Sequence, residues 1–285
     1  AQASEGPHLG GGHAEVTARA SYYAGGGLPG ADVAWQVMAK PTTYTPPNRS
    51  DFIFGVWTPW WWTRPIHDEA GKRESFQGRT DGSGKHVLRI DFDGVEPPRP
   101  SSVSAEGTVM DVNRQAWTGT AALLVHPSRL YVGLKSRRVF VQKGEPLVVE
   151  AIVTDIDGTA VPGRACKLRA ERLDWVQEKG EWREKAVGQE ECALTSGKEG
   201  QSCRFATKEG GVYRITARVA DDQGRANESE FRLWVAGGKL PPRRNVEREE
   251  AQLIPDQKDY RAGETAELLV LSPFAPAAGV LPLRR

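Results

Sequence analysis

Three cysteines are the residues best suited to covalent chemistry in this chain. Cys192 and Cys203 flank the segment ALTSGKEGQS, which has turn-forming residues at its centre. If the two flanks pair as a hairpin, their Cα atoms lie about 4.5–5.5 Å apart, which suits a disulfide. The sequence therefore predicts a Cys192–Cys203 bond, with Cys166 as a buried free thiol and an oxidising compartment. Three reduced core cysteines are the alternative.

The histidines and the nucleophiles form no catalytic or metal-binding motif. The five histidines are scattered, and no His-Glu-x-x-His pattern is present. The chain also lacks the Gly-x-Ser-x-Gly nucleophile elbow and the phosphate-binding Gly-x-x-x-x-Gly-Lys-Ser/Thr loop. We therefore expect no catalytic residues, no bound metal, no cofactor and no enzymatic activity.

Two Asp-x-Asp-Gly stretches, at residues 91–94 and 155–158, contain the oxygen ligands that calcium prefers. A complete calcium loop needs further ligands and a distal glutamate, which neither stretch supplies. Both stretches follow predicted strands. The pattern therefore favours ordinary turns over calcium sites.

The tryptophans Trp57, Trp60, Trp61 and Trp62 lie within six residues of one another. Consecutive side chains of a strand point to opposite faces, so these rings cannot all enter one core. We interpret the cluster as a candidate interface to a neighbouring module. Two alternatives are that the segment folds back and buries the rings, or that the rings stack on sugars.

Alternating apolar and polar residues dominate the rest of the chain, for example at residues 14–20, 85–92 and 213–219. This period of two is typical of half-buried strands, and clusters of Gly, Pro, Asp and Asn separate the runs. No window predicts a helix of three turns. The pattern predicts an all-β chain of tandem antiparallel β-sandwich modules.

An internal repeat sets the expected module limits. Val16 and Ala18 recur as Val149 and Ala151, and Val109 recurs as Val219. The repeat predicts a first module at 13–128, a second at 129–238, and the opening strands of a third at 251–285, after the linker GGKLPPRRNVEREE. The first module is expected to lack its first strand and to carry a Trp-rich insertion. The chain thus resembles a piece of a longer protein.

Three segments resemble the macroglobulin modules of bacterial alpha-2-macroglobulins: AEGTVMDVNRQAWTGTAALLVHPSRLYVGL, GGVYRITARVADDQGRANESEFRLWVAGG and LIPDQKDYRAGETAELLVLSPF. The last is similar to the family's module opening, here Asp256, Lys258, Tyr260, Gly263 and Glu264. The resemblance implies macroglobulin- or fibronectin-III-like sandwiches. Within them, Tyr213 is expected at a sandwich corner and Trp234 in a core.

The resemblance also implies a function. Members of the family trap proteases after a bait segment is cut, and many capture them through a thioester in the motif Cys-Gly-Glu-Gln. Here the cysteines are followed by Lys167, Ala193 and Arg204, and no bait segment is evident. The chain is therefore expected to be a scaffold segment of a periplasmic or secreted endopeptidase inhibitor of the cell envelope. Its partners would be neighbouring modules and, through the parent, proteases.

Charge and hydropathy exclude other partners. The formal net charge is +1, and basic and acidic residues are interspersed, so we expect no nucleic-acid binding. No run of about 18 apolar residues is present, so we expect no membrane insertion within this segment. The alternative function is a cell-surface adhesion or carbohydrate-binding module that uses the Trp-rich insertion.

Overall fold

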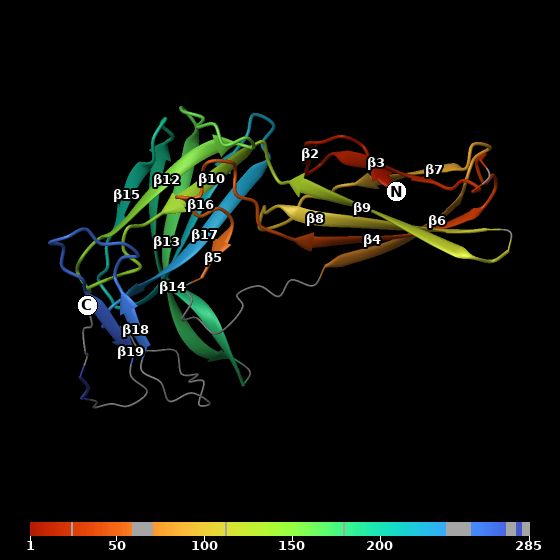
Figure 1. Cartoon of the computed structure of the whole chain (residues 1–285). Helices are drawn as coiled ribbons and strands as arrows, with labels where there is room; N and C mark the ends of the chain where they lie inside the picture. Colours follow the sequence, from red (N-terminus) through yellow and green to blue (C-terminus); the bar gives the residue numbers. More distant parts are fainter. Residues whose placement is uncertain are drawn as a thin grey trace.

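The computed structural model describes residues 1–23, 25–58, 71–111, 113–178, 180–237, 252–271 and 278–280. Within these ranges every regular element is a β-strand. A helix that could cross a membrane is not found among the described residues. Two sandwiches follow one another along the chain, and a short C-terminal hairpin lies beside the second (Figure 1). The predicted all-β sandwich fold is confirmed.

The first module contains the strands β1 (Gln2–Ala3), β2 (His8–Leu9), β3 (His13–Arg19), β4 (Asp32–Pro41), β6 (Lys72–Arg79), β7 (Lys85–Asp91), β8 (Ser101–Met110) and β9 (Ala116–His126). Among the described residues they form a three-stranded sheet in the order β1-β3-β7 and a five-stranded sheet in the order β2-β9-β8-β4-β6. Side chains of β8 alternate between buried and more exposed, as expected for a strand with one face on a core.

The second module contains the strands β10 (Leu130–Lys135), β11 (Phe140–Val141), β12 (Leu147–Asp155), β13 (Ala165–Glu178), β14 (Glu181–Thr195), β15 (Gln201–Phe205), β16 (Gly211–Ala220) and β17 (Ala226–Val235). Its sheets have the orders β10-β12-β15 and β11-β17-β16-β13-β14, and β5 (Val56–Trp57) adds to β17. A final hairpin pairs β18 (Gln252–Pro255) with β19 (Leu268–Leu271).

The two modules share one strand plan. In each, a short strand pairs in parallel with the last strand: β2 with β9, and β11 with β17. In each, the opening strand pairs antiparallel with the third, β1 with β3 and β10 with β12. The prediction that the first module lacks its first strand is therefore wrong. Its first strand is β1, and two residues are too few to give an alternating pattern.

Each core lies between the two sheets of its module. The first is built around Trp35, which is fully buried, and the second around Phe205 and Phe231. The predicted tyrosine corner is present, because the Tyr213 hydroxyl donates to the Glu209 carbonyl at 2.8 Å. Trp234 is 8% exposed and contributes to a smaller core between the second module and the C-terminal hairpin.

Glycine permits the turns that open the repeats. Gly144 and Gly263 have φ of 94° and 92°, in the left-handed region that most side chains disfavour. The β10–β12 and β18–β19 pairings follow the same antiparallel pattern. The C-terminal hairpin thus has the arrangement expected of a module opening, whereas the predicted linker falls almost wholly outside the described residues.

The structure contains the Cys192–Cys203 disulfide, with 6.2 Å between the two Cα atoms. The predicted hairpin geometry is wrong, because β14 and β15 lie in different sheets. Both are edge strands among the described residues, so the bond joins the sheets along one side of the sandwich. Cys166 is free and buried, and desolvation raises the pKa of its thiol to about 12. This thiol therefore stays protonated and unreactive near neutral pH.

Candidate functional site: the junction between the modules

A strap, residues 42–58, leaves the first module after β4 and runs onto the second. Ile53 forms an antiparallel bridge with Leu134. Further along, β5 pairs in parallel with β17 at Glu230 and Phe231. The first module therefore contributes a strand to the sheet of the second. Main-chain pairing of this kind fixes the strap in register, as in any sheet.

An apolar cluster anchors the strap. It contains Phe52 and Phe54 from the strap, together with Tyr131 and Ile152 of the second module. Gly133 makes the close approach possible, because a Cβ there would lie 2.6 Å from the Phe54 ring and 2.9 Å from Phe52 Cβ. Full burial of one such side chain is worth about 1.5–3 kcal/mol, so this cluster stabilises the docked strap.

Hydrogen bonds hold the strap on both sides of that cluster. Arg49 Nε donates to the Gly158 carbonyl at 2.7 Å, and the Tyr44 hydroxyl donates to the Ile156 carbonyl at 2.9 Å. The buried amide of Gly55 donates to Ser229 Oγ at 2.9 Å. A Cβ on Gly158 would lie only 2.0 Å from the Pro47 carbonyl oxygen. The turn at residues 155–158 is therefore shaped to accept the strap.

His126, at the end of β9, lies in an aromatic cluster with Tyr44 and Tyr131. Its Nδ1 is 2.7 Å from the Tyr131 hydroxyl, and its ring centroid is 4.9 Å from that of Tyr44. Desolvation and the nearby His8 lower the pKa of His126, although Asp157 opposes this shift. Desolvation raises the pKa of both tyrosines. The cluster is thus neutral near pH 7.

The loop before β8 also contacts the second module directly. The Glu228 amide donates to the Pro98 carbonyl at 3.1 Å. Arg99 lies 3.5 Å from Glu230, with both side chains under 10% exposed, and Arg218 lies 3.1 Å from Glu96. Burial raises the pKa of Glu228, and the nearby Arg218 and Arg99 only partly oppose it. The junction therefore combines the apolar contacts of the strap with buried charged groups.

The predicted site residues fall only partly within the described residues. Trp57 lies in β5 and is partly buried against the core of the second module, opposite Phe231. Trp60, Trp61 and Trp62 lie outside the described residues. The interface role of the whole cluster therefore stays a prediction. Sequence reasoning missed the strap residues before Trp57, although Phe52 and Phe54 precede the tryptophans of the predicted Trp-rich insertion by only a few residues.

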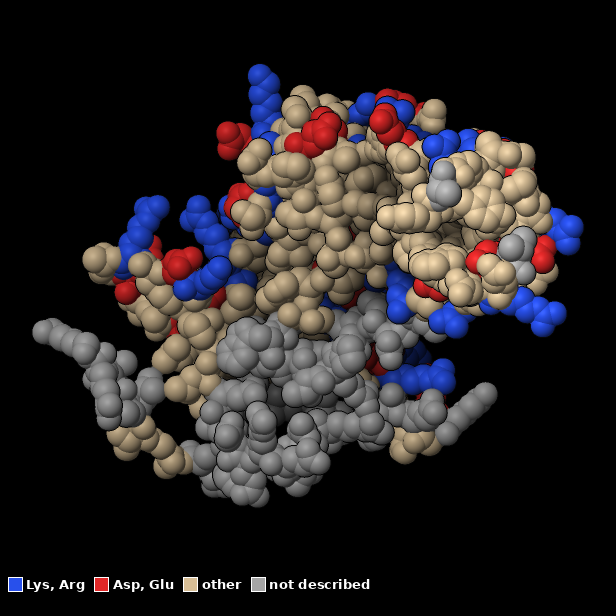
Figure 2. Space-filling model, turned by 45° about the vertical axis from the view of Figure 1, so that its right-hand side comes forward, with Lys and Arg blue, Asp and Glu red and all other residues tan. Residues whose placement is uncertain are grey.

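The Asp-x-Asp-Gly stretches behave as turns. Asp155 Oδ1 accepts a hydrogen bond from the Thr159 amide at 2.8 Å, and Asp93 forms an ion pair with Lys72. Within the described part of the chain, no group of three or more His, Cys, Asp or Glu side chains is placed to hold a metal ion. On the face drawn in Figure 2, basic and acidic side chains are interspersed and do not gather into one patch.

The described residues thus form two tandem sandwiches of one strand plan, joined by a strap. No family model matches the chain. Among curated proteins, it is 23% identical over 273 residues to an alpha-2-macroglobulin homologue of Nostoc sp., covering 92% of this chain and 14% of that protein. It is also 27% identical over 161 residues to circularly permutated Ras protein 2 of Dictyostelium discoideum, covering 53% of this chain and 4% of that protein.

Solved structures show the same architecture. Trypsin-activated alpha-2-macroglobulin from Escherichia coli matches with a TM-score of 0.57 and 16% identity, over 95% of this chain and 19% of that one. Methylamine-reacted Salmonella alpha-2-macroglobulin matches with a TM-score of 0.54 and 15% identity, over 95% of this chain and 18% of that one. The predicted resemblance to bacterial alpha-2-macroglobulins is confirmed, and the chain spans less than a fifth of the length of these relatives.

Proposed function

We propose that the chain is a scaffold segment of a bacterial alpha-2-macroglobulin-like protein that traps proteases at the cell envelope. The observation that carries this proposal is the similarity to the Nostoc homologue along 92% of the chain, which includes both modules and the strap. A scaffold role needs modules that keep a fixed relation to one another. The strap, with its buried rings and paired main chain, supports that requirement.

The disulfide supports an extracytoplasmic location, because such bonds persist in the periplasm and outside the cell but are rare in a reducing cytosol. The partners in this proposal are the neighbouring modules of the same parent chain and, through the whole parent, proteases. The segment itself performs no catalysis. We expect the isolated chain neither to hydrolyse substrates nor to form covalent adducts with proteases, because no cysteine stands in a Cys-Gly-Glu-Gln motif.

The test uses the full-length parent protein mixed with trypsin. A trapped protease is shielded from large substrates but still reached by small ones. We therefore expect the parent to slow the cleavage of casein while leaving the hydrolysis of a small chromogenic peptide unchanged. If neither activity changes, or if both fall equally, the trapping proposal is wrong.

A matched pair of variants tests the scaffold role. Phe54→Ser removes a ring that is 5% exposed in the strap cluster, and Phe76→Ser removes a ring that is 37% exposed on β6. In the parent, Phe54→Ser should weaken the protection of casein, and Phe76→Ser should leave it near the wild-type level. Equal protection by both variants would mean that the strap does not support the trap.

A further inference from the structure

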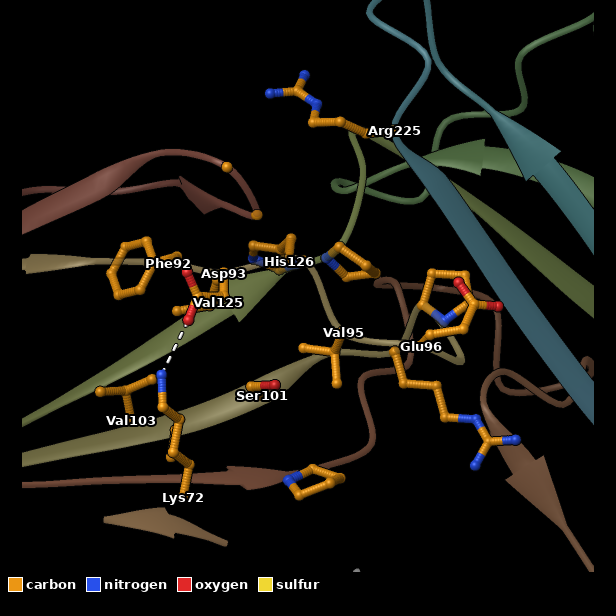
Figure 3. A pocket seen from close by; sticks show the side chains of 18 of the residues that line it. Lys72, Phe92, Asp93, Val95, Glu96, Ser101, Val103, Val125, His126 and Arg225 are labelled. Atoms are coloured by element: carbon orange, nitrogen blue, oxygen red, sulfur yellow. Dashed lines mark hydrogen bonds and ion pairs between the residues drawn. The ribbon is translucent and has the colours of Figure 1, made fainter. Parts of the chain in front are cut away.

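A cavity of about 630 Å³ lies where the first module meets the second (Figure 3). Core side chains at the end of the first sandwich form much of its wall, among them Val37, Val103 and Val125, each at most 6% exposed. Val95 also lines it and is 43% exposed. The size and the apolar wall are typical of small-molecule sites, which are concave, mostly apolar and about 300–1,000 Å³.

The second module contributes to the opposite wall. The turn between β16 and β17 brings Gly224 and Arg225 to the cavity, and Arg218 of β16 also lines it. In Figure 3, Arg225 and the Lys72–Asp93 pair lie at separate places around the cavity. The cavity therefore exists only when the two modules are docked. A ligand that binds in it would therefore indicate that the junction is formed.

Most charged groups around the cavity are already paired. The carboxylates that line it have these basic partners: Glu74 and Asp93 contact Lys72, Asp91 contacts Arg89, and Glu96 contacts Arg218. Each lining acid thus has a basic group at ion-pair distance, and Glu74 and Asp93 share the one on Lys72. A cationic ligand would have to displace one of these pairs.

Two of the lining bases, Lys40 and Arg99, are less fully paired than the acids. Lys40 is exposed and has no ion-pair partner among the described residues. Arg99 is 8% exposed, and its Nε has no hydrogen-bond partner in the described part of the chain. Its ion pair with Glu230 is long, at 3.5 Å. A buried donor without an acceptor is costly, so this wall of the cavity favours an anionic group.

We propose that the cavity binds a small amphipathic carboxylate, such as a medium-chain fatty carboxylate. Its alkyl body lies against Val37, Val103 and Val125, and its carboxylate faces Lys40 and Arg99. Apolar burial supplies most of the affinity, and the charges of Lys40 and Arg99 select the head group. Binding here does not depend on protease trapping, because the cavity involves only the junction of the two modules in this chain.

The experiment is calorimetric titration of the full chain with dodecanoate below its micelle concentration, with dodecanol as the uncharged probe. We expect saturable dodecanoate binding and weaker dodecanol binding. Lys40→Gln should weaken dodecanoate binding about two- to fivefold, the value of a partly exposed ion pair, without changing dodecanol binding. Val95→Asp should weaken dodecanoate binding about tenfold or more, because it adds a negative charge to the apolar wall.

The control variant is Lys85→Gln, at the start of β7, the strand whose other end reaches the cavity. It removes the same charge from the surface and should leave dodecanoate binding unchanged. The proposal is overturned if dodecanoate gives no saturable heat, if dodecanol binds equally well, or if Lys85→Gln weakens binding as much as Lys40→Gln. Lys40 and Val95 are exposed, so both variants should keep the wild-type far-UV circular dichroism spectrum.

Discussion

The chain contains two junctions, and different interactions hold each of them. At the first, the strap places Phe52 and Phe54 against Tyr131 and Ile152 of the second module. At the second, the C-terminal hairpin inserts Ile254 into a small apolar cluster, and Arg138 contacts three neighbouring carboxylates. The strap contact at the first junction is thus mainly apolar, whereas the hairpin contact at the second adds a cluster of charged groups to its apolar one.

The ionic junction is built around Asp256, which is 2% exposed. Desolvation would raise the pKa of Asp256, but hydrogen bonds from Tyr260 and the Glu267 amide, together with Arg138, lower it below the usual value. This carboxylate therefore stays charged and needs its partners. Ionic contacts weaken with salt, whereas apolar burial does not, so the two junctions should respond differently to conditions.

The largest expected effect comes from Gly158→Ala. Its φ of 87° disfavours alanine, and the added Cβ would lie 2.0 Å from the Pro47 carbonyl of the strap. We expect a loss of about 1–2 kcal/mol from backbone strain and about 1–3 kcal/mol more from the clash. The free energy of unfolding, from urea titration, measures the loss, and limited proteolysis shows whether the strap is released.

Gly163→Ala is the matched control. Gly163 has a similar φ of 80°, but no described atom lies within 4 Å of the position that the alanine methyl group would occupy. This variant should lose only the strain energy and keep the strap protected from proteases. Equal losses of unfolding free energy in the two variants would show that the strap does not pack against residue 158. The packing of the strap on the second module would then be wrong at this turn.

The second largest effect is expected for Arg138→Gln at the ionic junction. The variant leaves Asp256 without its cation and removes the hydrogen bonds that Arg138 donates to Glu145 and Glu267. Hydrogen bonds to charged groups are worth about 1.5–3 kcal/mol. The loss should be larger in low salt than in high salt, because salt already weakens the wild-type contact. Urea titration at two ionic strengths measures both quantities.

Arg79→Gln serves as the comparison, since Arg79 pairs with Asp32 on an open surface where both side chains are more than 70% exposed. Such a pair contributes about 0–1 kcal/mol, so this variant should change the free energy of unfolding very little. If Arg138→Gln also leaves the free energy of unfolding unchanged, the apolar cluster alone holds the second junction. The contrast between the two junctions is then wrong.

The sequence predicts best those sandwich strands that have one face on a core, as the alternation of β3 and β8 shows. It predicts the disulfide partners but not their geometry, since nothing local tells whether adjacent strands share a sheet. The strap could not be predicted, because Phe52 and Phe54 lie in an irregular segment whose contacts are more than 70 residues away. Only the predicted Trp-rich insertion pointed to this part of the chain.

Tyr44→Phe should have a smaller effect on the apolar junction. The substitution keeps the ring against His126 and removes the hydrogen bond to the Ile156 carbonyl. A neutral hydrogen bond contributes about 0.5–1.5 kcal/mol, and this loss should not depend on salt. A salt-dependent loss in urea titrations would indicate that Tyr44 acts through the ionic part of the strap, the exposed Asp51–Lys135 pair, and not through its own hydrogen bond.

The smallest effect is a difference in pH response between the junctions. Desolvation, together with His8, lowers the pKa of His126 in the folded chain, so the unfolded chain binds more protons just below pH 6.5. The free energy of unfolding should therefore fall as the pH drops below about 6.5, with a slope of at most about 1.4 kcal/mol per pH unit. Asp256, whose pKa is lowered, contributes stability that is lost only at more acidic pH, as the pH falls through its folded pKa.

His126→Gln separates the two responses. Glu228, whose pKa burial raises, acts in the opposite direction, so the informative quantity is the difference in slope between wild type and variant. Between about pH 7.5 and 5.5, His126→Gln should flatten the dependence, whereas Asp256→Asn should leave its slope unchanged, because Asp ordinarily titrates near 3.9. A slope that survives His126→Gln would place the acid-sensitive group elsewhere and remove the link between protonation and the apolar junction.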